Sequence, residues 1–208
     1  MAIDPCKQFV CDLDGTLYRE TDYVISGLRA VATALATGLA KTKGQQSMAS
    51  QYYAHMRGEF LANGRARVFS TLIERYSIAA PMKAILSVYR QHTPHIKLYP
   101  DAAALLDRIG HDITIITNTP RDIALRKRAA LGLTDATLVA DAGKPAPDAF
   151  RAVAGILDGP LVYVGDDPLF DVDGARAAGM ETVIVDRLGV WREGCDADLV
   201  VSSLDALG

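Results

Sequence analysis

The chain has 208 residues, 22 basic and 25 acidic side chains, and a formal net charge of −3, and half of its residues are hydrophobic. This composition excludes a disordered chain, which has fewer apolar residues, and a basic nucleic-acid-binding protein, which has an excess of Lys and Arg. The sequence contains no apolar run approaching the roughly 20 residues that a membrane-spanning helix needs.

The first predicted element is a short buried strand over residues 7–11, which ends abruptly in the loop Asp12-Leu13-Asp14-Gly15-Thr16. Residues 18–93 then have the pattern of helices separated by Gly44, Asn63-Gly64 and Pro81, and no segment among them has the pattern of a strand. The helices that we predict in this region span residues 24–39, 47–61, 68–76 and 82–91.

After Pro94, helices alternate with short strands rich in Val, Ile and Leu. The predicted strands span residues 113–117, 137–140, 161–164, 182–185 and 198–201. The predicted helices span residues 101–109, 121–131, 147–156 and 171–178. Continuous apolar strands that alternate with helices are typical of a parallel sheet covered on both faces. We therefore predict an α/β fold, with a doubly wound, Rossmann-like core of residues 1–17 and 94–208 and an inserted all-helical segment of residues 18–93.

Polar residues follow the apolar strands of the predicted core. The first strand leads to Asp12 and Asp14, and later strands lead to Thr117-Asn118, to Gly143-Lys144-Pro145 and to Gly165-Asp166-Asp167 with Asp171 close behind. The carboxyl ends of parallel strands lie on one edge of the sheet, where open α/β folds bind ligands. These residues are therefore expected to converge on one crevice.

The expected crevice combines carboxylates with groups that bind anions. Up to five aspartates would repel one another there, and Mg2+ would relieve this repulsion, since it binds a few carboxylate oxygens together with waters and a phosphate. Thr117, Lys144 and backbone N–H groups would bind the anion. Taken singly, each motif has a simpler structural explanation: a turn for Asp12 to Thr16, a strand end for Thr117, a solvated loop for Lys144 and a helix cap for Asp171. Their joint occurrence at successive strand ends favours a phosphoryl-transfer site.

In this order, Asp12-Leu13-Asp14-Gly15-Thr16, Thr117-Asn118, Lys144-Pro145 and Gly165-Asp166-Asp167 with Asp171 resemble the four motifs of the haloacid dehalogenase (HAD) superfamily. The resemblance covers the whole predicted core. The helical segment after the first motif is similar to the small cap of one branch of this superfamily.

The resemblance implies a role for each motif residue. Asp12 would be the nucleophile that forms an aspartyl-phosphate, and Asp14 would protonate the leaving alcohol and then activate water. Mg2+ would be bound by the Asp12 side chain, the Asp14 main-chain carbonyl and Asp166. The residues that would bind the phosphate are Leu13, Thr117, Asn118 and Lys144, and Thr117 and Lys144 would also take part in catalysis. Asp171, and less directly Asp167, would support the metal through waters.

Asp167 departs from the pattern of the superfamily, because many relatives carry Ser or Thr there. Its carboxylate would either tune metal affinity or point away from the site. Dehalogenases resemble this chain least, because they commonly lack the second aspartate of the first motif, which is present here as Asp14. A Mg2+-dependent phosphatase is the favoured function, and a phosphomutase or a non-catalytic phosphometabolite sensor are the alternatives.

A cap over the crevice would favour a small phosphorylated metabolite, with no nucleic acid or membrane as partner. Its arginines Arg57, Arg65 and Arg67 are candidates for contacts with the substrate, although exposed arginines are more often simply solvated. The three cysteines have no metal-ligand spacing, and the first residues lack the pattern of a secretory signal. We therefore expect a cytoplasmic protein with reduced thiols, and by default a monomer.

Overall fold

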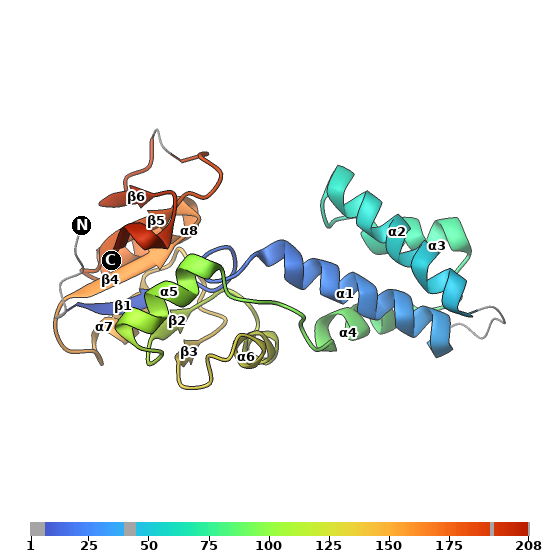
Figure 1. Cartoon of the computed structure of the whole chain (residues 1–208), viewed down its shortest axis with the longest axis horizontal. Helices are drawn as coiled ribbons and strands as arrows, with labels where there is room; N and C mark the ends of the chain where they lie inside the picture. The colour runs from blue at the N-terminus through green and yellow to red at the C-terminus, as the bar shows by residue number, and fades with distance from the viewer. Residues whose placement is uncertain (1–6, 40–44, 192–193, 208) are drawn as a thin grey trace. The chain divides into compact units, whose positions relative to one another are not determined.

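The structure is a computed structural model that describes residues 7–39, 45–191 and 194–207 (Figure 1). The chain forms two compact units. One is made of Met1–Glu20 and Ile96–Gly208, and the other is the intervening segment Thr21–His95. We call them the α/β unit and the helical unit.

The α/β unit is built on a six-stranded sheet with the strand order β3-β2-β1-β4-β5-β6. The strands are β1 (Gln8–Cys11), β2 (Thr114–Ile116), β3 (Thr137–Val139), β4 (Leu161–Gly165), β5 (Glu181–Val185) and β6 (Leu199–Val201). All five pairings are parallel, and central β1 pairs Val10 with Thr114 of β2 and with Tyr163 of β4. The parallel α/β fold predicted from the sequence is therefore confirmed.

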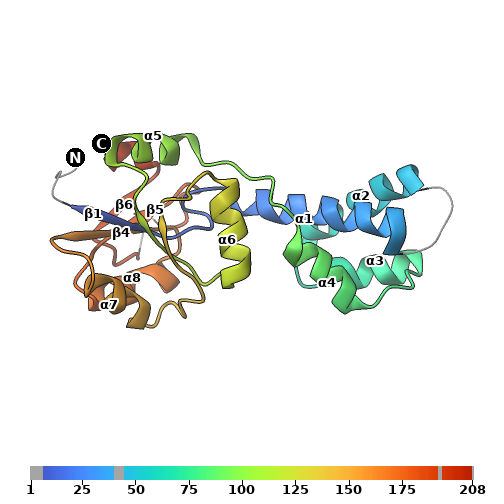
Figure 2. The same ribbon diagram turned by 90° about the horizontal axis from the view of Figure 1, so that it is seen from below.

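Helices cover both faces of this sheet, as the apolar character of its strands requires. They are α5 (Pro100–Ile109), α6 (Arg121–Ala130), α7 (Asp148–Ala154), α8 (Pro168–Ala177) and the 3-10 helix η2 (Leu204–Leu207). Helix α5 packs with η2 on one face, and α7 packs with α8 on the other (Figure 2). Phe150 of α7 and Tyr163 of β4 are fully buried and meet edge to face in the core beneath α7 and α8. The parallel pairings place the carboxyl ends of the strands at one edge of the sheet.

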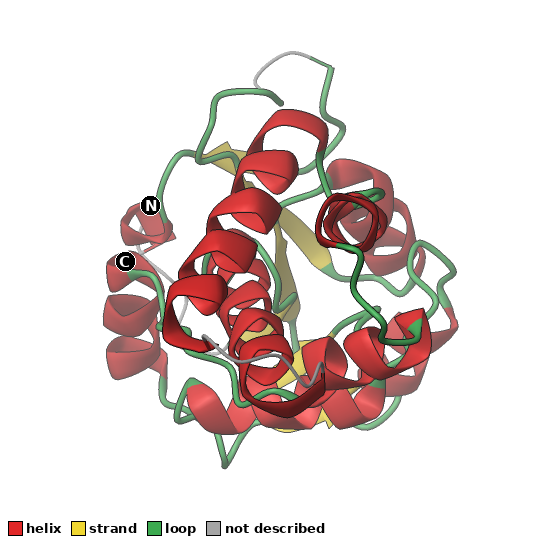
Figure 3. Ribbon diagram, turned by 90° about the vertical axis from the view of Figure 1, so that its right-hand side faces the viewer, coloured by secondary structure: helices red, strands yellow, loops and turns green. Residues whose placement is uncertain are grey.

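The helical unit contains no strand among its described residues (Figure 3). Its elements are α1 (Glu20–Ala34), the π-helical segment η1 (Leu35–Leu39), α2 (Gln45–Asn63), α3 (Val68–Tyr76) and α4 (Met82–Gln91). Leu28, Met56, Leu72 and Ile85, one from each α-helix, are fully buried in a common core. This core is separate from that of the sheet.

The main differences from the predicted elements lie at helix ends. The predicted helix over residues 24–39 begins earlier, at Glu20, and its regular α-helical part ends at Ala34, because the backbone of Gly38 in the following segment is not helical. The predicted helix over 171–178 begins at Pro168, because proline fits the first turn of a helix and Asp167 caps it. No helix in the described ranges is long and apolar enough to cross a membrane.

Candidate active site

A cavity of about 450 Å3 lies at the carboxyl ends of the strands, entirely within the α/β unit. It is lined by residues that follow β1, β2 and β4 and by the loop that carries Lys144: Asp12, Asp14, Glu20, Thr117, Asn118, Thr119, Pro120, Lys144, Asp166, Asp167, Phe170 and Asp171. The structure thus brings together the motif side chains to which a role was assigned, namely Asp12, Asp14, Thr117, Asn118, Lys144, Asp166, Asp167 and Asp171. Leu13, the remaining predicted phosphate-binding residue of the motifs, has a fully buried side chain and does not line the cavity.

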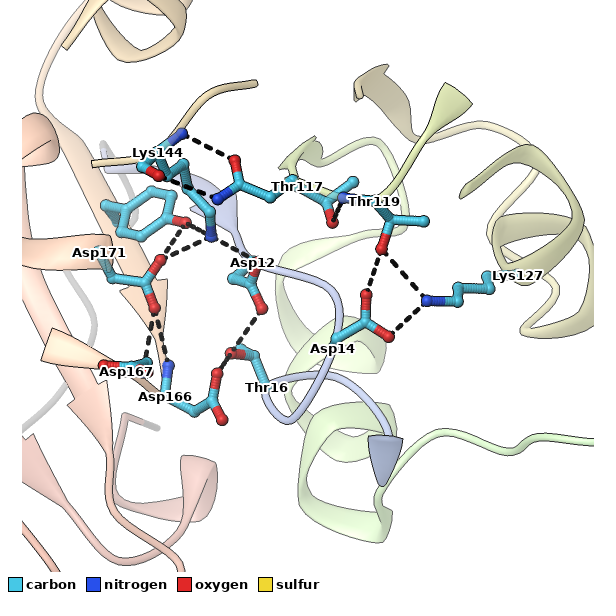
Figure 4. A network of polar contacts seen from close by, with 12 residues as sticks. Asp12, Asp14, Thr16, Thr117, Thr119, Lys127, Lys144, Asp166, Asp167 and Asp171 are labelled. Carbon is cyan, nitrogen blue, oxygen red and sulfur yellow. Dashed lines mark hydrogen bonds and ion pairs between the residues drawn. The ribbon is translucent and has the colours of Figure 1, made fainter. Parts of the chain in front are cut away.

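Lys144 links two of the aspartates at the centre of this cavity (Figure 4). Its Nζ atom lies 2.6 Å from Asp12 Oδ1 and 2.7 Å from Asp171 Oδ1. It also donates to the hydroxyl oxygen of Tyr163 at 3.0 Å, and this hydroxyl donates to Asp171 Oδ1 at 2.9 Å. A buried ammonium is stable only when it is paired, and this arrangement supplies the partners.

The side chain of Asn118 holds the main chain of Lys144 in place. Asn118 Oδ1 accepts from Lys144 N at 2.7 Å, and Asn118 Nδ2 donates to Lys144 O at 3.0 Å. The Asn118 amide therefore anchors the loop that presents the lysine. Contact between Asn118 and phosphate stays a prediction.

Asp171 organises the loop after β4. Its Oδ2 atom accepts from the backbone N–H groups of Asp166 and Asp167, at 3.2 Å and 3.1 Å. Gly165 is needed here, because a Cβ at this position would lie 2.2 Å from Asp171 Oδ2. The capping residue of α8 is Asp167, whose carboxylate accepts from Leu169 N at 3.0 Å, so the helix-cap explanation considered for Asp171 is wrong.

Thr16 lies between the carboxylates of Asp12 and Asp166. Its hydroxyl group is 3.4 Å from Asp12 Oδ2 and 3.3 Å from Asp166 Oδ1. Gly15 leaves room for Asp166, because a Cβ at residue 15 would lie 2.0 Å from Asp166 Oδ2. The Thr16 hydroxyl group is thus close to two carboxylates, one that follows β1 and one that follows β4.

Asp14 has partners of its own, on the other side of the loop from Lys144. Its Oδ1 atom accepts from Lys127 Nζ at 2.6 Å and from the hydroxyl group of Tyr18, and its Oδ2 atom accepts from Thr119 Oγ1 at 2.7 Å. The first-loop aspartates are therefore bound by different lysines, Asp12 by Lys144 and Asp14 by Lys127.

These environments shift the pKa values of the two aspartates in opposite directions. Burial raises the pKa of Asp12 well above its usual value, against the opposing charge of Lys144 and with the help of Asp171 and Asp166. Burial would also raise the pKa of Asp14, but the charge and hydrogen bond of Lys127, together with the hydrogen bonds of Tyr18 and Thr119, lower it overall. Burial and the charge of Asp171 raise the pKa of Asp166 to about 7. Ionising both Asp12 and Asp166 therefore costs free energy in the folded protein, and a cation bound between them would offset this cost.

The donor chemistry around Asp12 and Asp166 fits a hard divalent cation. Within the described ranges, no cluster of three or more His, Cys, Asp or Glu side chains forms a ready-made metal site. Mg2+ does not require such a cluster, because it binds through one or two carboxylates together with waters and substrate phosphate. Asp12 and Asp166 would supply these carboxylates, because burial raises their pKa values and a cation beside them would favour their ionised forms.

Other predicted site residues are placed as follows. Thr117 is buried, lines the cavity and accepts from Thr119 N at 3.1 Å through its Oγ1 atom, which leaves its own proton free to be donated. Arg57, Arg65 and Arg67 are exposed residues of the helical unit, so contact between them and a substrate stays a prediction.

Sequence reasoning missed Thr16, Thr119, Lys127 and Tyr163. For Lys127 a signal exists in the sequence, because Ile123, Ala124 and Leu131 share its helical face, three or four residues away. Tyr163 lies within an apolar strand, so its sequence context predicts only an aromatic residue of the core.

Comparison with known proteins agrees with this architecture. A sequence model of the haloacid dehalogenase-like hydrolases matches residues 6–179. The chain is 31% identical over 198 aligned positions to a ribulose-1,5-bisphosphate 5-phosphatase from Halopiger xanaduensis, covering 84% of this chain and 82% of the relative. It is 29% identical over 227 positions to a plasmid-encoded phosphoglycolate phosphatase from Cupriavidus necator, covering 98% and 92%.

The fold is shared with solved structures. A 2-haloacid dehalogenase from Pseudomonas syringae pv. Tomato superposes with a TM-score of 0.60 at 18% identity, over 96% of this chain and 95% of that one. The chain therefore belongs to the haloacid dehalogenase-like hydrolase family, as its four motifs predicted.

Proposed function

We propose that the protein is a Mg2+-dependent phosphatase that hydrolyses a small phosphomonoester through an aspartyl-phosphate on Asp12. The observation that supports this most is the pairing of two aspartates, two residues apart, with different lysines at one cavity. The named phosphatases among its relatives support the same reaction class.

In the first step, an Asp12 carboxylate oxygen attacks the substrate phosphorus and the bond from phosphorus to the leaving oxygen breaks. The negative charge of the bound ester opposes the effect of Lys127 on the pKa of Asp14, so Asp14 takes up a proton and gives it to that oxygen, and the product leaves as a neutral alcohol. Lys144, 2.6 Å from Asp12, offsets the negative charge that the phosphoryl group brings to a buried carboxylate.

In the second step, water attacks the phosphorus of the aspartyl-phosphate and gives a proton to Asp14. The bond between phosphorus and the Asp12 oxygen breaks, which frees phosphate and restores both aspartates. Thr117, whose hydroxyl proton is available at the cavity, donates to a phosphoryl oxygen in both steps. Bound Mg2+ would supply positive charge that neutralises the phosphoryl oxygens, held by Asp12, Asp166 and the Asp14 carbonyl.

The presence of Asp14 favours hydrolysis of a phosphate ester over dehalogenation. A halide needs no proton when it leaves, whereas an alkoxide does, and Asp14 lines the cavity beside Asp12. The expected substrate class is a small alkyl phosphate rather than a haloacid.

The test is phosphate release from a panel of small phosphomonoesters, with Mg2+ and with EDTA, combined with analysis of the organic product. Metal-dependent release of phosphate with the free alcohol as product supports the proposal. A phosphate that moves to another position on the substrate identifies a mutase and overturns it, as does binding of the esters without turnover.

A further inference from the structure

Lys127 is a buried lysine on the inner face of α6. Its side chain is 5% exposed, whereas its neighbours on both sides, Arg126 and Arg128, reach the surface or a loop carbonyl. Ile123 and Ala124 lie on the same face and are also buried. A lysine is rarely found in such a position unless its ammonium group is bound by charge.

The ammonium group of Lys127 is directed at the Asp14 carboxylate (Figure 4). Lys127 Nζ lies 2.6 Å from Asp14 Oδ1 and 3.2 Å from Thr119 Oγ1, and Thr119 Oγ1 lies 2.7 Å from Asp14 Oδ2. The lysine, the threonine and the carboxylate therefore form a closed triangle that fixes both oxygens of Asp14. The ring of Tyr18, whose hydroxyl group also binds Asp14, has its centre 5.9 Å from the same ammonium group.

Lys127 contacts residues that line the cavity but does not line it itself. Asp14 and Thr119 are among the described residues that line the cavity, and Lys127 is not. A substrate in the cavity would therefore meet Asp14 and Thr119 directly, while Lys127 would influence it only through them.

We propose that Lys127 is a positioning residue that, with Thr119, holds the Asp14 carboxyl group in the orientation from which its protonated form transfers a proton to the leaving oxygen. The inference rests on the proposed phosphatase function and adds a residue to it. An aspartate carboxylate rotates readily about its last side-chain bond, and proton transfer requires a heavy-atom distance of about 2.6–3.2 Å. The triangle removes this freedom before substrate arrives.

This role predicts an effect that depends on the leaving group. An alkyl alcohol needs a proton as it leaves, whereas p-nitrophenolate does not. The ratio kcat/KM reports the steps up to the first bond cleavage. Replacing Lys127 should therefore lower kcat/KM for an alkyl phosphate and leave kcat/KM for p-nitrophenyl phosphate nearly unchanged.

The experiment compares Lys127→Met, Lys127→Arg and the control Arg126→Met with the wild type, all with Mg2+. The substrates are p-nitrophenyl phosphate and the alkyl phosphate that the wild type hydrolyses best. Arg126 is on the same helix and pairs with Asp122 at 2.8 Å near the surface, so its loss removes a charge without touching Asp14. For Lys127→Met we expect kcat/KM on the alkyl phosphate to fall roughly 10-fold to 100-fold more than on p-nitrophenyl phosphate. Lys127→Arg should recover part of the loss, and Arg126→Met should match the wild type on both esters.

Thr119→Val is a second test if Lys127→Met does not fold. It removes the other hydrogen-bond donor of the triangle, and valine has nearly the same shape as threonine. The same selective loss on the alkyl phosphate is expected. Equal losses on both esters, or no loss on either, overturn the positioning role while the phosphatase activity of the wild type stands. If the wild type releases phosphate from neither ester, the proposed function and this inference are both overturned.

Discussion

Lys144 and Asp171, 27 residues apart in the chain, form an ion pair of 2.7 Å in which both side chains are buried, at 4% and 1% exposure. Because Lys144 also binds Asp12, a single ammonium group offsets two carboxylates. The same contact holds the loop after β4, whose backbone N–H groups bind the other oxygen of Asp171. Charge balance and loop geometry therefore depend on one lysine.

Lys144→Met is expected to lower the free energy of unfolding by about 3–5 kcal/mol, because it leaves two buried carboxylates without their cation. Urea denaturation at neutral pH measures this loss. Arg126→Met, which breaks an ion pair closer to the surface, is the control and should cost about 1 kcal/mol or less. Similar losses for the two variants would show that the buried pair does not stabilise the fold.

Mg2+ should stabilise the protein more at neutral pH than at acidic pH. The pKa of Asp166 is raised to about 7 by burial and by the charge of Asp171, whereas its usual value is 3.8. Between these two values the folded, metal-free protein binds more protons than the unfolded chain, so its stability falls as the pH rises. Bound Mg2+ removes this penalty. Asp14 and Asp101, whose pKa values are lowered, titrate below this window.

Thermal unfolding at about pH 7.5 and about pH 5.5, with and without Mg2+, tests this linkage. The increase in Tm on adding Mg2+ should be larger at the higher pH, and Asp166→Asn should abolish most of the difference. An increase that is the same at both pH values would contradict the assignment of Asp166 as a metal ligand.

Gly15→Ala is expected to weaken Mg2+ binding by displacing Asp166. The added Cβ would lie 2.0 Å from Asp166 Oδ2, and the φ angle of 84° at Gly15 adds backbone strain. Gly132→Ala separates the two effects, because Gly132 has a φ angle of 74° and open space around its Cβ position. Both variants should lose about 1 kcal/mol of stability through strain.

Isothermal titration with Mg2+ distinguishes the two glycine variants. Only Gly15→Ala should bind the metal more weakly, and Gly132→Ala should bind it like the wild type. Unchanged affinity in a folded Gly15→Ala protein would contradict the placement of Asp166 beside the first loop.

The sequence predicted the sheet and the motif residues of the cavity because both depend on local patterns. A continuous apolar strand that runs into Asp12, and others that run into Thr117 and Asp166, are visible without any tertiary structure. The parallel topology then requires their ends to meet.

The partners of the motif residues were not predictable in this way, because each contact joins segments that are distant in the chain. The apolar residues on its helical face indicate that Lys127 is buried, but only the fold shows that its ammonium group meets Asp14. Tyr163 looks like any aromatic residue of a buried strand until Lys144 and Asp171 meet its hydroxyl group. The role of Asp167, in contrast, depends on a local contact, since its carboxylate caps α8. Its position in a motif drew attention to the metal instead of to this cap.

The central claim, that Asp12 becomes phosphorylated, is tested most directly by a single-turnover experiment with Asp14→Asn, p-nitrophenyl phosphate and Mg2+. This ester needs no proton to leave, so the first step should proceed, while the second step should stall because the base that activates water is missing. We predict a burst of about one equivalent of p-nitrophenol, with one phosphoryl group on the peptide that contains Asp12 after acid quenching. Turnover by the wild type without any burst or phosphorylated peptide in Asp14→Asn would contradict the covalent mechanism.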